Sequence, residues 1–167
     1  MRKLLPLLLC AVTLCFAQYG GRRAPGWALP DSKMNITDLA DFRGKYVLLE
    51  FMQTNCPHCA AFADVLKQAE QRYGAKVQVI AVVKAPEDNA ATVGQYVAGH
   101  GVNYPVLFDA GQMMYSYLRS NQMTFPHLYV IDPGGTIVRD WTYGLTTRDI
   151  FEGKGLLMNL DAIINKK

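Results

Sequence analysis

Cysteine is scarce in this sequence. The chain has four cysteines, and two of them, Cys10 and Cys15, lie at the extreme N-terminus. The rest of the chain therefore has only Cys56 and Cys59. A zinc site needs a second pair of ligands at short spacing, and no further cysteine supplies one. A single structural disulfide remains an alternative for this pair.

Strong charge asymmetry is also missing. The formal net charge is +3, and it falls to 15 − 14 = +1 without Arg2 and Lys3. No run of basic residues stands out in the rest of the chain, so nothing here predicts nucleic acid or an anionic membrane surface as a partner. The sequence has no internal repeat and no low-complexity tract. Half of its residues are hydrophobic, which argues against a disordered chain.

The N-terminal segment has the layout of a secretory signal peptide. Arg2 and Lys3 precede an apolar run at residues 4–16, and the small residue Ala17 follows it. The run is too short to span a membrane comfortably. We therefore expect a signal peptide at residues 1–17, one domain at 18–167, and export to the periplasm or another extracytoplasmic compartment. A segment retained as a membrane anchor is the alternative.

The Cys-x-x-Cys of Cys56 and Cys59 is the most informative motif. It follows the apolar run Tyr46–Met52, which predicts a buried strand, and precedes an alanine-rich segment with helical apolar spacing. Backbone N–H groups and the helix dipole favour an anion at a helix start. The thiolate is the form that attacks disulfides. The motif predicts thiol–disulfide exchange, with Cys56 as the attacking nucleophile and Cys59 as the resolving thiol.

Three neighbouring residues complete the predicted site. Pro57 fits the first helical turn, where its missing N–H costs nothing. His58, if protonated, places a second positive charge beside the thiolate; an exposed histidine without effect is the alternative. Glu50 lies within the apolar strand, which favours burial over a surface carboxylate paired with a lysine.

The remaining apolar pattern alternates between strand and helix periods. It predicts a helix from the motif to about residue 73, strands at 77–83 and 104–109, helices at 92–98 and 112–118, a hairpin of 124–132 with 136–143, and a terminal helical segment at 146–165 broken near Gly153 and Gly155. A short helical turn capped by Thr37 is expected before the first strand. The order predicts an α/β domain with a mixed central sheet flanked by helices.

These elements resemble the thioredoxin superfamily, and overall the TlpA/ResA-like group of exported thiol–disulfide oxidoreductases. The resemblance rests on four features: Ala24-Pro25 through Asp31, Gly44-Lys45 before the active-site strand, the strand–Cys-x-x-Cys–helix unit, and Phe125-Pro126 before the hairpin. It implies a thioredoxin-like fold in which residues 92–108 form the helix–strand insertion typical of this group.

The active-site stretch is more similar to DsbA, the strongly oxidising member of the superfamily. The similarity lies in Glu50-Phe51, in Cys56 through Cys59, and in Phe62. It implies that Glu50 lies beneath the cysteines and accepts a proton from Cys59. It also implies that His58 stabilises the thiolate, and with it the reduced state, which makes the pair a stronger oxidant.

The resemblance gives Phe125 and Pro126 roles in substrate binding. Pro126 would be a cis proline facing the cysteines, and the backbone of Phe125 would bind an incoming peptide as an added strand. An ordinary trans turn is the alternative for Pro126. Two departures leave the direction of exchange open, because Phe62 replaces an acidic residue common in the TlpA/ResA group and Phe125 replaces a small or β-branched one.

Taken together, the resemblance implies an exported enzyme with a redox-active Cys56–Cys59 disulfide. Its substrates would be protein thiols and disulfides, its redox partner is an unidentified protein, and no small-molecule cofactor is implied. We expect a monomer without membrane contact beyond the export segment. The motif slightly favours an oxidant, whereas the TlpA/ResA-like body favours a reductant.

Two other functions remain open. The first is a copper-handling protein that binds Cu(I) through both cysteines and a histidine such as His127, although no third soft ligand has motif spacing. By strand alternation His127 is expected to point away from the cysteines. The second is a thiol peroxidase, because Thr54 precedes Cys56 by two positions, as a peroxidase threonine does.

Overall fold

The computed structural model describes residues 21–120 and 122–165. The predicted signal peptide, with Cys10 and Cys15, lies outside the described residues. Within those two ranges, no helix is both long enough and apolar enough to cross a membrane.

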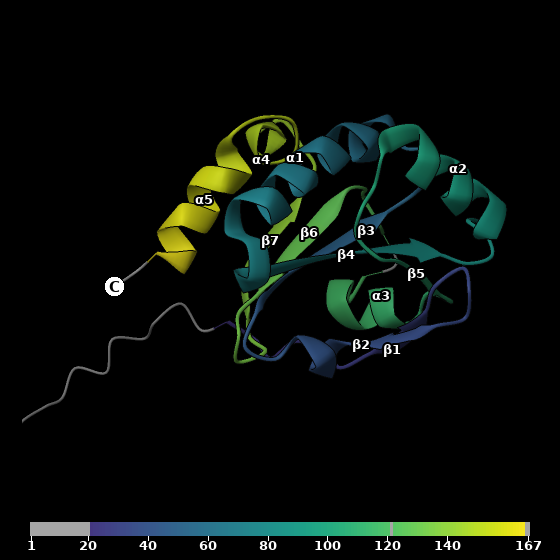
Figure 1. Ribbon diagram of the computed structural model, residues 1–167, viewed down its shortest axis with the longest axis horizontal. Coiled ribbons are helices and arrows are strands. Elements are labelled where there is room, and N and C mark those ends of the chain that lie inside the picture. Colours follow the sequence, from purple (N-terminus) through teal and green to yellow (C-terminus); the bar gives the residue numbers. More distant parts are fainter. Residues whose placement is uncertain (1–20, 121, 166–167) are drawn as a thin grey trace, which may run out of the picture.

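A five-stranded mixed sheet forms the centre of the molecule (Figure 1). Its strand order is β5-β4-β3-β6-β7. The central strand β3 (Tyr46–Met52) runs parallel to β4 (Val77–Lys84), which in turn runs parallel to β5 (Val106–Asp109). On its other side β3 pairs antiparallel with β6 (His127–Ile131), and β6 pairs antiparallel with β7 (Ile137–Thr142). The predicted α/β architecture with a mixed sheet is confirmed.

Helices cover both faces of this sheet (Figure 1). One face carries α1 (Pro57–Tyr73), α2 (Ala90–His100), α4 (Arg148–Glu152) and α5 (Gly155–Ile164). The other face carries α3 (Gln112–Leu118) and the small two-stranded sheet of β1 (Ala28–Pro30) and β2 (Ile36–Asp38). The predicted helix–strand insertion is present as α2 and β5, and β5 forms one edge of the sheet.

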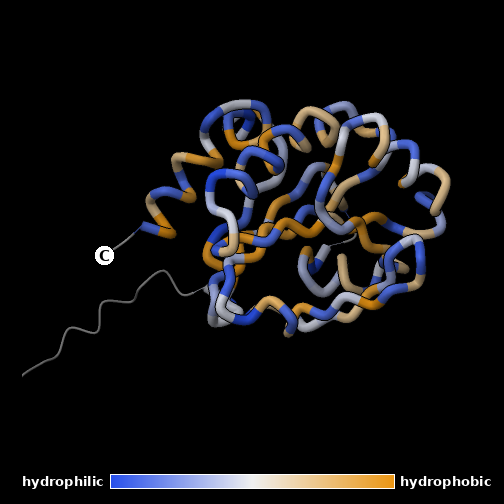
Figure 2. Tube along the Cα trace, in the orientation of Figure 1, coloured by the Kyte–Doolittle hydropathy of each residue, from blue (hydrophilic) through white to orange (hydrophobic). Residues whose placement is uncertain are grey.

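Strand β3 is apolar along nearly its whole length because both of its faces are covered (Figure 2). Leu48 and Met52 pack under α1, whereas Leu49 and Phe51 pack toward α3. Side chains two apart in a strand share a face, so Glu50 lies on the same face as Leu48 and Met52. The strand therefore directs a carboxyl group into the core beneath the helix that carries the cysteines.

The sequence-based prediction was wrong in the segment before β3. Thr37 does not cap a helical turn, because it lies in β2 and pairs with Leu29. The following 3-10 helix, Leu39–Phe42, is capped by Asp38, whose carboxylate accepts a hydrogen bond from the Ala40 N–H. Both residue types can cap a helix, and the pairing with β1 decides which one lies at its start.

Later elements follow the apolar pattern, with shifts at their ends. Helix α2 begins at Ala90, earlier than predicted, because the side chain of Asn89 accepts hydrogen bonds from the Ala91 and Thr92 N–H groups. It ends at His100, and the C-cap residue Gly101 adopts a left-handed conformation with φ 59°. The terminal helical segment is divided after Glu152, at Gly153, as the sequence predicts.

Candidate active site

Cys56 lies at the N-cap of α1, and the three-residue loop 53–55 separates it from the carboxyl end of β3. Pro57 is the first helical residue and loses no helix hydrogen bond there. The Cys59 backbone N–H donates to the Cys56 sulfur, with 3.3 Å between nitrogen and Sγ. Cys56 is partly exposed. The sulfur predicted to react therefore lies at the positive end of a helix and remains accessible from solvent.

Cys59 lies one turn further along the helix and is fully buried. Both cysteines are free thiols in this structure. Burial raises the pKa of the Cys59 thiol, and the nearby negative charge of Glu50 raises it further. The Cys59 carbonyl accepts a hydrogen bond of 2.9 Å from the hydroxyl of Tyr96 on α2. The second cysteine is therefore a protonated, inaccessible thiol until the site rearranges or accepts its proton.

Glu50 is completely buried, as its place in the strand predicts. Among the described residues, neither of its carboxyl oxygens has a hydrogen-bond partner. Burial raises the pKa of Glu50 well above its ordinary value. Its charge also contributes to raising the pKa of Cys59, so the two groups interact across the interior. A carboxyl group with this environment can hold or accept a proton near neutral pH.

The Phe125-Pro126 peptide bond is cis. The Phe125 carbonyl oxygen lies 3.9 Å from the Cys56 sulfur, which places this turn against the first cysteine. The Pro126 carbonyl accepts a 3.0 Å hydrogen bond from the Tyr143 N–H at the end of the hairpin. The structure thus brings together the two segments that the sequence predicted to face each other. Binding of a peptide at Phe125 remains a prediction.

His58 belongs to a cluster that the sequence did not predict, which we call the Glu152 cluster: His58, Tyr143, Arg148 and Glu152. The His58 ring stacks on the Tyr143 ring, with 4.0 Å between centroids and 20° between planes. Its Nδ1 lies 2.9 Å from Glu152 Oε1. Glu152 also accepts hydrogen bonds of 2.6 Å from the Tyr143 hydroxyl and from Arg148 Nε. The four-residue spacing of Arg148 and Glu152 indicates a helical pair, but nothing in the sequence connects it with His58.

The threonine that suggested a peroxidase is bound to another side chain. The Thr54 hydroxyl donates to the carboxylate of Asp88, and the Thr54 N–H points toward the same carboxylate. Asp88 is buried and also accepts a hydrogen bond from the Thr92 hydroxyl on α2. These contacts hold the loop before Cys56 against the start of α2. Sequence reasoning did not identify Asp88.

His127 does not join the cysteines. Its Nε2 lies 2.6 Å from Asp140 on β7, and its ring stacks on Tyr129, which packs on the α3 side of the sheet. This orientation agrees with the predicted strand alternation. In the part of the chain that the structure describes, no three His, Cys, Asp or Glu side chains are grouped so as to hold a metal ion.

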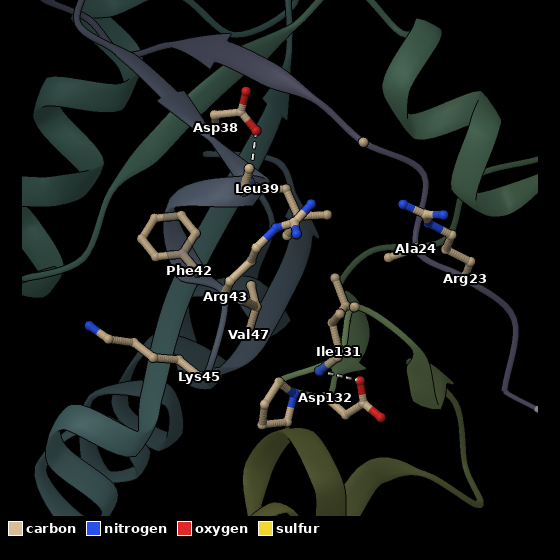
Figure 3. A pocket seen from close by; sticks show the side chains of 15 residues that line it. Arg23, Ala24, Asp38, Leu39, Phe42, Arg43, Lys45, Val47, Ile131 and Asp132 are labelled. Carbon is tan, nitrogen blue, oxygen red and sulfur yellow. Dashed lines mark hydrogen bonds between the residues drawn. The ribbon is translucent and has the colours of Figure 1, made fainter.

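A cavity of about 310 Å³ lies at the opposite end of β3 from Cys56 (Figure 3). Charged side chains on its wall include Arg23, Asp38, Arg43, Lys45 and Asp132. Both carboxylates are hydrogen-bonded to backbone N–H groups of their own turns. None of the residues predicted for the redox site lines this cavity.

Comparison with known proteins identifies the family. A model of the AhpC/TSA family matches residues 21–140, which include both cysteines, Glu50 and Pro126. The chain belongs to the AhpC/TSA family. The match extends from the start of the described residues into β7, so it covers four strands of the central sheet and most of the fifth.

Relatives of this AhpC/TSA protein are similar over most of their length. "Thioredoxin-like protein YneN" of Bacillus subtilis is 27% identical over 80% of this chain and 77% of its own. "Thiol-disulfide oxidoreductase ResA" of the same organism is 26% identical over 92% of this chain and 89% of its own. The crystal structure of a putative thiol:disulfide interchange protein DsbE from Chlorobium tepidum has a TM-score of 0.67 and 23% identity, covering 84% of this chain and 96% of that one.

These findings confirm the predicted thioredoxin-like fold and the resemblance to the ResA group. They also confirm the class of enzyme, a thioredoxin-like thiol–disulfide oxidoreductase. The individual roles of Cys56, Pro57, His58, Cys59, Glu50, Phe125 and Pro126 remain predictions that the geometry supports.

Proposed function

We propose that this protein is an exported oxidoreductase that exchanges disulfides with protein substrates through Cys56 and Cys59. The observation that carries the proposal is the position of Cys56. The residue is partly exposed at a helix N-cap, and its sulfur accepts a hydrogen bond from the Cys59 N–H and lies 3.9 Å from the Phe125 carbonyl oxygen. A nucleophilic thiolate is favoured at such a position, and an extended peptide can reach it along the Phe125 backbone.

In the oxidising direction, the reaction starts from a Cys56–Cys59 disulfide. A substrate thiolate attacks the Cys56 sulfur, forming a mixed disulfide and releasing Cys59 as a thiolate. Glu50 supplies the proton that the buried Cys59 sulfur then holds. A second substrate thiolate displaces Cys56, which leaves as a thiolate, so the substrate loses two electrons and gains a disulfide. The reducing direction is the same sequence in reverse, with Cys56 as the attacking group.

The local environment favours the oxidising direction. The Cys59 N–H and the helix N-terminus favour an anion at the Cys56 sulfur, which exists as a thiolate only in the reduced protein, and a proton on His58 would add a positive charge in the same helical turn. Stabilising the reduced state makes the disulfide a stronger oxidant. Export rests on the N-terminal sequence, where Arg2 and Lys3 precede an apolar run and Ala17. The unidentified redox partner would reoxidise the cysteines.

Replacement of Cys56 tests this function directly. Cys56→Ser should abolish catalysed disulfide exchange in an insulin-reduction assay, because serine does not form the mixed disulfide. Glu87→Gln, which changes an exposed carboxylate paired with Lys84, should keep full activity as a matched control. Full exchange activity in Cys56→Ser would contradict the proposal.

Equilibration with glutathione tests the direction. An oxidant should have a reduction potential near that of DsbA, ~−120 mV, whereas a reductant should lie near thioredoxin, ~−270 mV. A value at the thioredoxin end would leave the exchange activity intact and reverse the assigned direction.

A further inference from the structure

Glu152 is bound from three sides at the edge of the redox site. It lies at the end of α4, 94 positions from His58 in the sequence. One carboxylate oxygen accepts a hydrogen bond from the Tyr143 hydroxyl and lies 2.9 Å from His58 Nδ1. The other oxygen accepts a hydrogen bond from Arg148 Nε. The Tyr143 ring at the same time forms the surface on which the His58 ring lies. Three side chains from two other segments therefore fix the orientation of one imidazole.

The carboxylate stays ionised in the working range of the enzyme. Hydrogen bonds from Tyr143, Arg148 and His58 lower the pKa of Glu152 to about 2. An ionised carboxylate can only accept hydrogen bonds, so His58 Nδ1 must donate to it. The proton of neutral His58 is thereby fixed on Nδ1. A histidine without such a partner would divide between two tautomers and several rotamers.

We propose that Glu152 is a positioning residue for disulfide exchange, which acts through His58: it holds the imidazole on Tyr143 with Nδ1 protonated, and it pairs with the imidazolium when His58 carries a second proton. His58 lies two residues after Cys56 in the first turn of α1. This inference rests on the proposed function. It gives a residue outside the Cys-x-x-Cys motif a role in setting the reduction potential of the Cys56–Cys59 pair.

The charges of the Glu152 cluster explain the direction of the effect. The groups around His58 are Cys56 on its own helix, Tyr143 after β7, and Arg148 with Glu152 on α4. With His58 protonated, the cluster holds two positive charges and one negative charge, a net charge of +1. Glu152 thus holds the two cations together, one on each carboxylate oxygen, where they would otherwise repel each other. Removing its charge should release Arg148 to solvent and disfavour the imidazolium.

The variant Glu152→Gln tests this inference while preserving the size of the side chain. In the reduced variant, the Cys56 thiolate should form at a higher pH than in the wild type. Its formation is monitored by the ultraviolet absorbance of the thiolate. The equilibrium with glutathione should shift toward the enzyme disulfide by about two- to fivefold, since the ion pair is partly exposed and screened by solvent. The nitrogen NMR signals of His58 should change from a single Nδ1–H tautomer to a mixture. Glu152→Asp should recover part of each change.

A double variant shows whether Glu152 acts through His58. In a His58→Ala background, Glu152→Gln should change the glutathione equilibrium by much less than it does in the wild type. Equal changes in both backgrounds would overturn the inference, because Glu152 would then act without His58. Unchanged thiolate titration, potential and NMR signals in Glu152→Gln would overturn it as well. Glu87→Gln serves as the matched control, with none of these changes expected.

The failure of this inference can be told apart from the failure of the proposed function. If Cys56→Ser is inactive and Glu152→Gln behaves as the wild type, the exchange activity stands and the role of Glu152 is lost. If Cys56→Ser remains active, the proposed function itself fails. Thermal unfolding of each variant, measured in parallel, separates a changed redox site from a changed fold.

Discussion

The two cysteines lie one helical turn apart and have opposite surroundings. Cys56 is partly exposed at the N-cap, where it accepts a backbone N–H and lies beside the Phe125 carbonyl. Cys59 is fully buried above Glu50, and this burial raises the pKa of its thiol. The difference arises along the axis of α1, because Cys56 is the N-cap at its partly exposed end, whereas Cys59 lies one turn further in, where the helix packs on the sheet.

This contrast teaches how one motif supports two chemical roles. An accessible sulfur stabilised as an anion can attack or be attacked by a substrate. A buried sulfur cannot meet a substrate, but it can attack its neighbour in the same helix and release the mixed disulfide. The buried carboxyl group of Glu50 interacts with Cys59. The Glu152 cluster includes His58, which lies two residues after Cys56. We therefore propose a separate tuning group for each cysteine.

The largest effect is expected from removal of the buried cysteine alone. Cys59→Ser should form a mixed disulfide with substrate and keep it, because no resolving thiol remains, so turnover should be almost lost. The trapped complex should be visible by mass spectrometry and should disappear on reduction. Cys56→Ser should trap no such complex. A stable complex formed by Cys56→Ser instead would reverse the two roles.

The next effect concerns the carboxyl group under Cys59. Glu50→Gln should slow release of the mixed disulfide by roughly 100-fold near pH 7, the low end of a general acid–base contribution. Formation of the mixed disulfide at Cys56 should slow much less, which rapid-quench kinetics would resolve. Equal slowing of both steps would contradict a specific link between Glu50 and Cys59.

The same variant should change stability in a manner that depends on pH. Burial raises the pKa of Glu50 above its ordinary value of 4.5. Below pH 4.5 the group is protonated in both states, and its contribution to stability is fully present. As the pH rises through the folded-state pKa, this contribution is lost, because ionisation favours the unfolded chain.

Glu50→Gln should therefore be more stable than the wild type at pH 8 and about equally stable at pH 4. The gain at pH 8 should exceed ~1 kcal/mol, since a buried unpaired charge costs several kcal/mol. Urea unfolding of both reduced proteins across this pH range measures it. A gain that is constant with pH would show that ionisation of Glu50 is not its cause.

The smallest effect should come from the hydrogen bond that α2 makes to the second cysteine. Tyr96→Phe removes the hydroxyl that donates to the Cys59 carbonyl and should cost about 1 kcal/mol of unfolding free energy. Exchange rates should change by less than about threefold, because the sulfur and Glu50 remain in place. Tyr115→Phe, on an exposed side chain, is the matched control. An effect as large as that of Glu50→Gln would assign α2 a direct role in resolution.

Much of the fold could be predicted because its elements carry strong local signals. The bounds of β3 and α3 follow directly from their apolar runs, and α1 begins at the motif and ends before Gly74. The small sheet of β1 and β2 could not be predicted, because strands of three residues carry too little periodicity. The N-cap at Asp38 rather than Thr37 depends on that unpredicted pairing.

The residues of the candidate site likewise fall into those with a local sequence signal and those without one. Cys56, Cys59 and Glu50 could be found from spacing and burial within one strand–helix unit, and Pro126 from a family resemblance. Glu152 and Asp88 could not, because each reaches the site from a distant segment through a side-chain hydrogen bond. Contacts of this kind depend on how α4 and α2 pack against α1, and no local sequence pattern predicts that packing.

Alkylation of the reduced protein tests the contrast between the cysteines most directly. A limiting amount of iodoacetamide near neutral pH, followed by peptide mass spectrometry, reports how fast each sulfur reacts. We predict that Cys56 is modified at least ~10-fold faster than Cys59, since only Cys56 is both partly exposed and located at the helix N-cap, where a thiolate is favoured. Equal rates, or faster modification of Cys59, would contradict the assignment of Cys56 as the nucleophile.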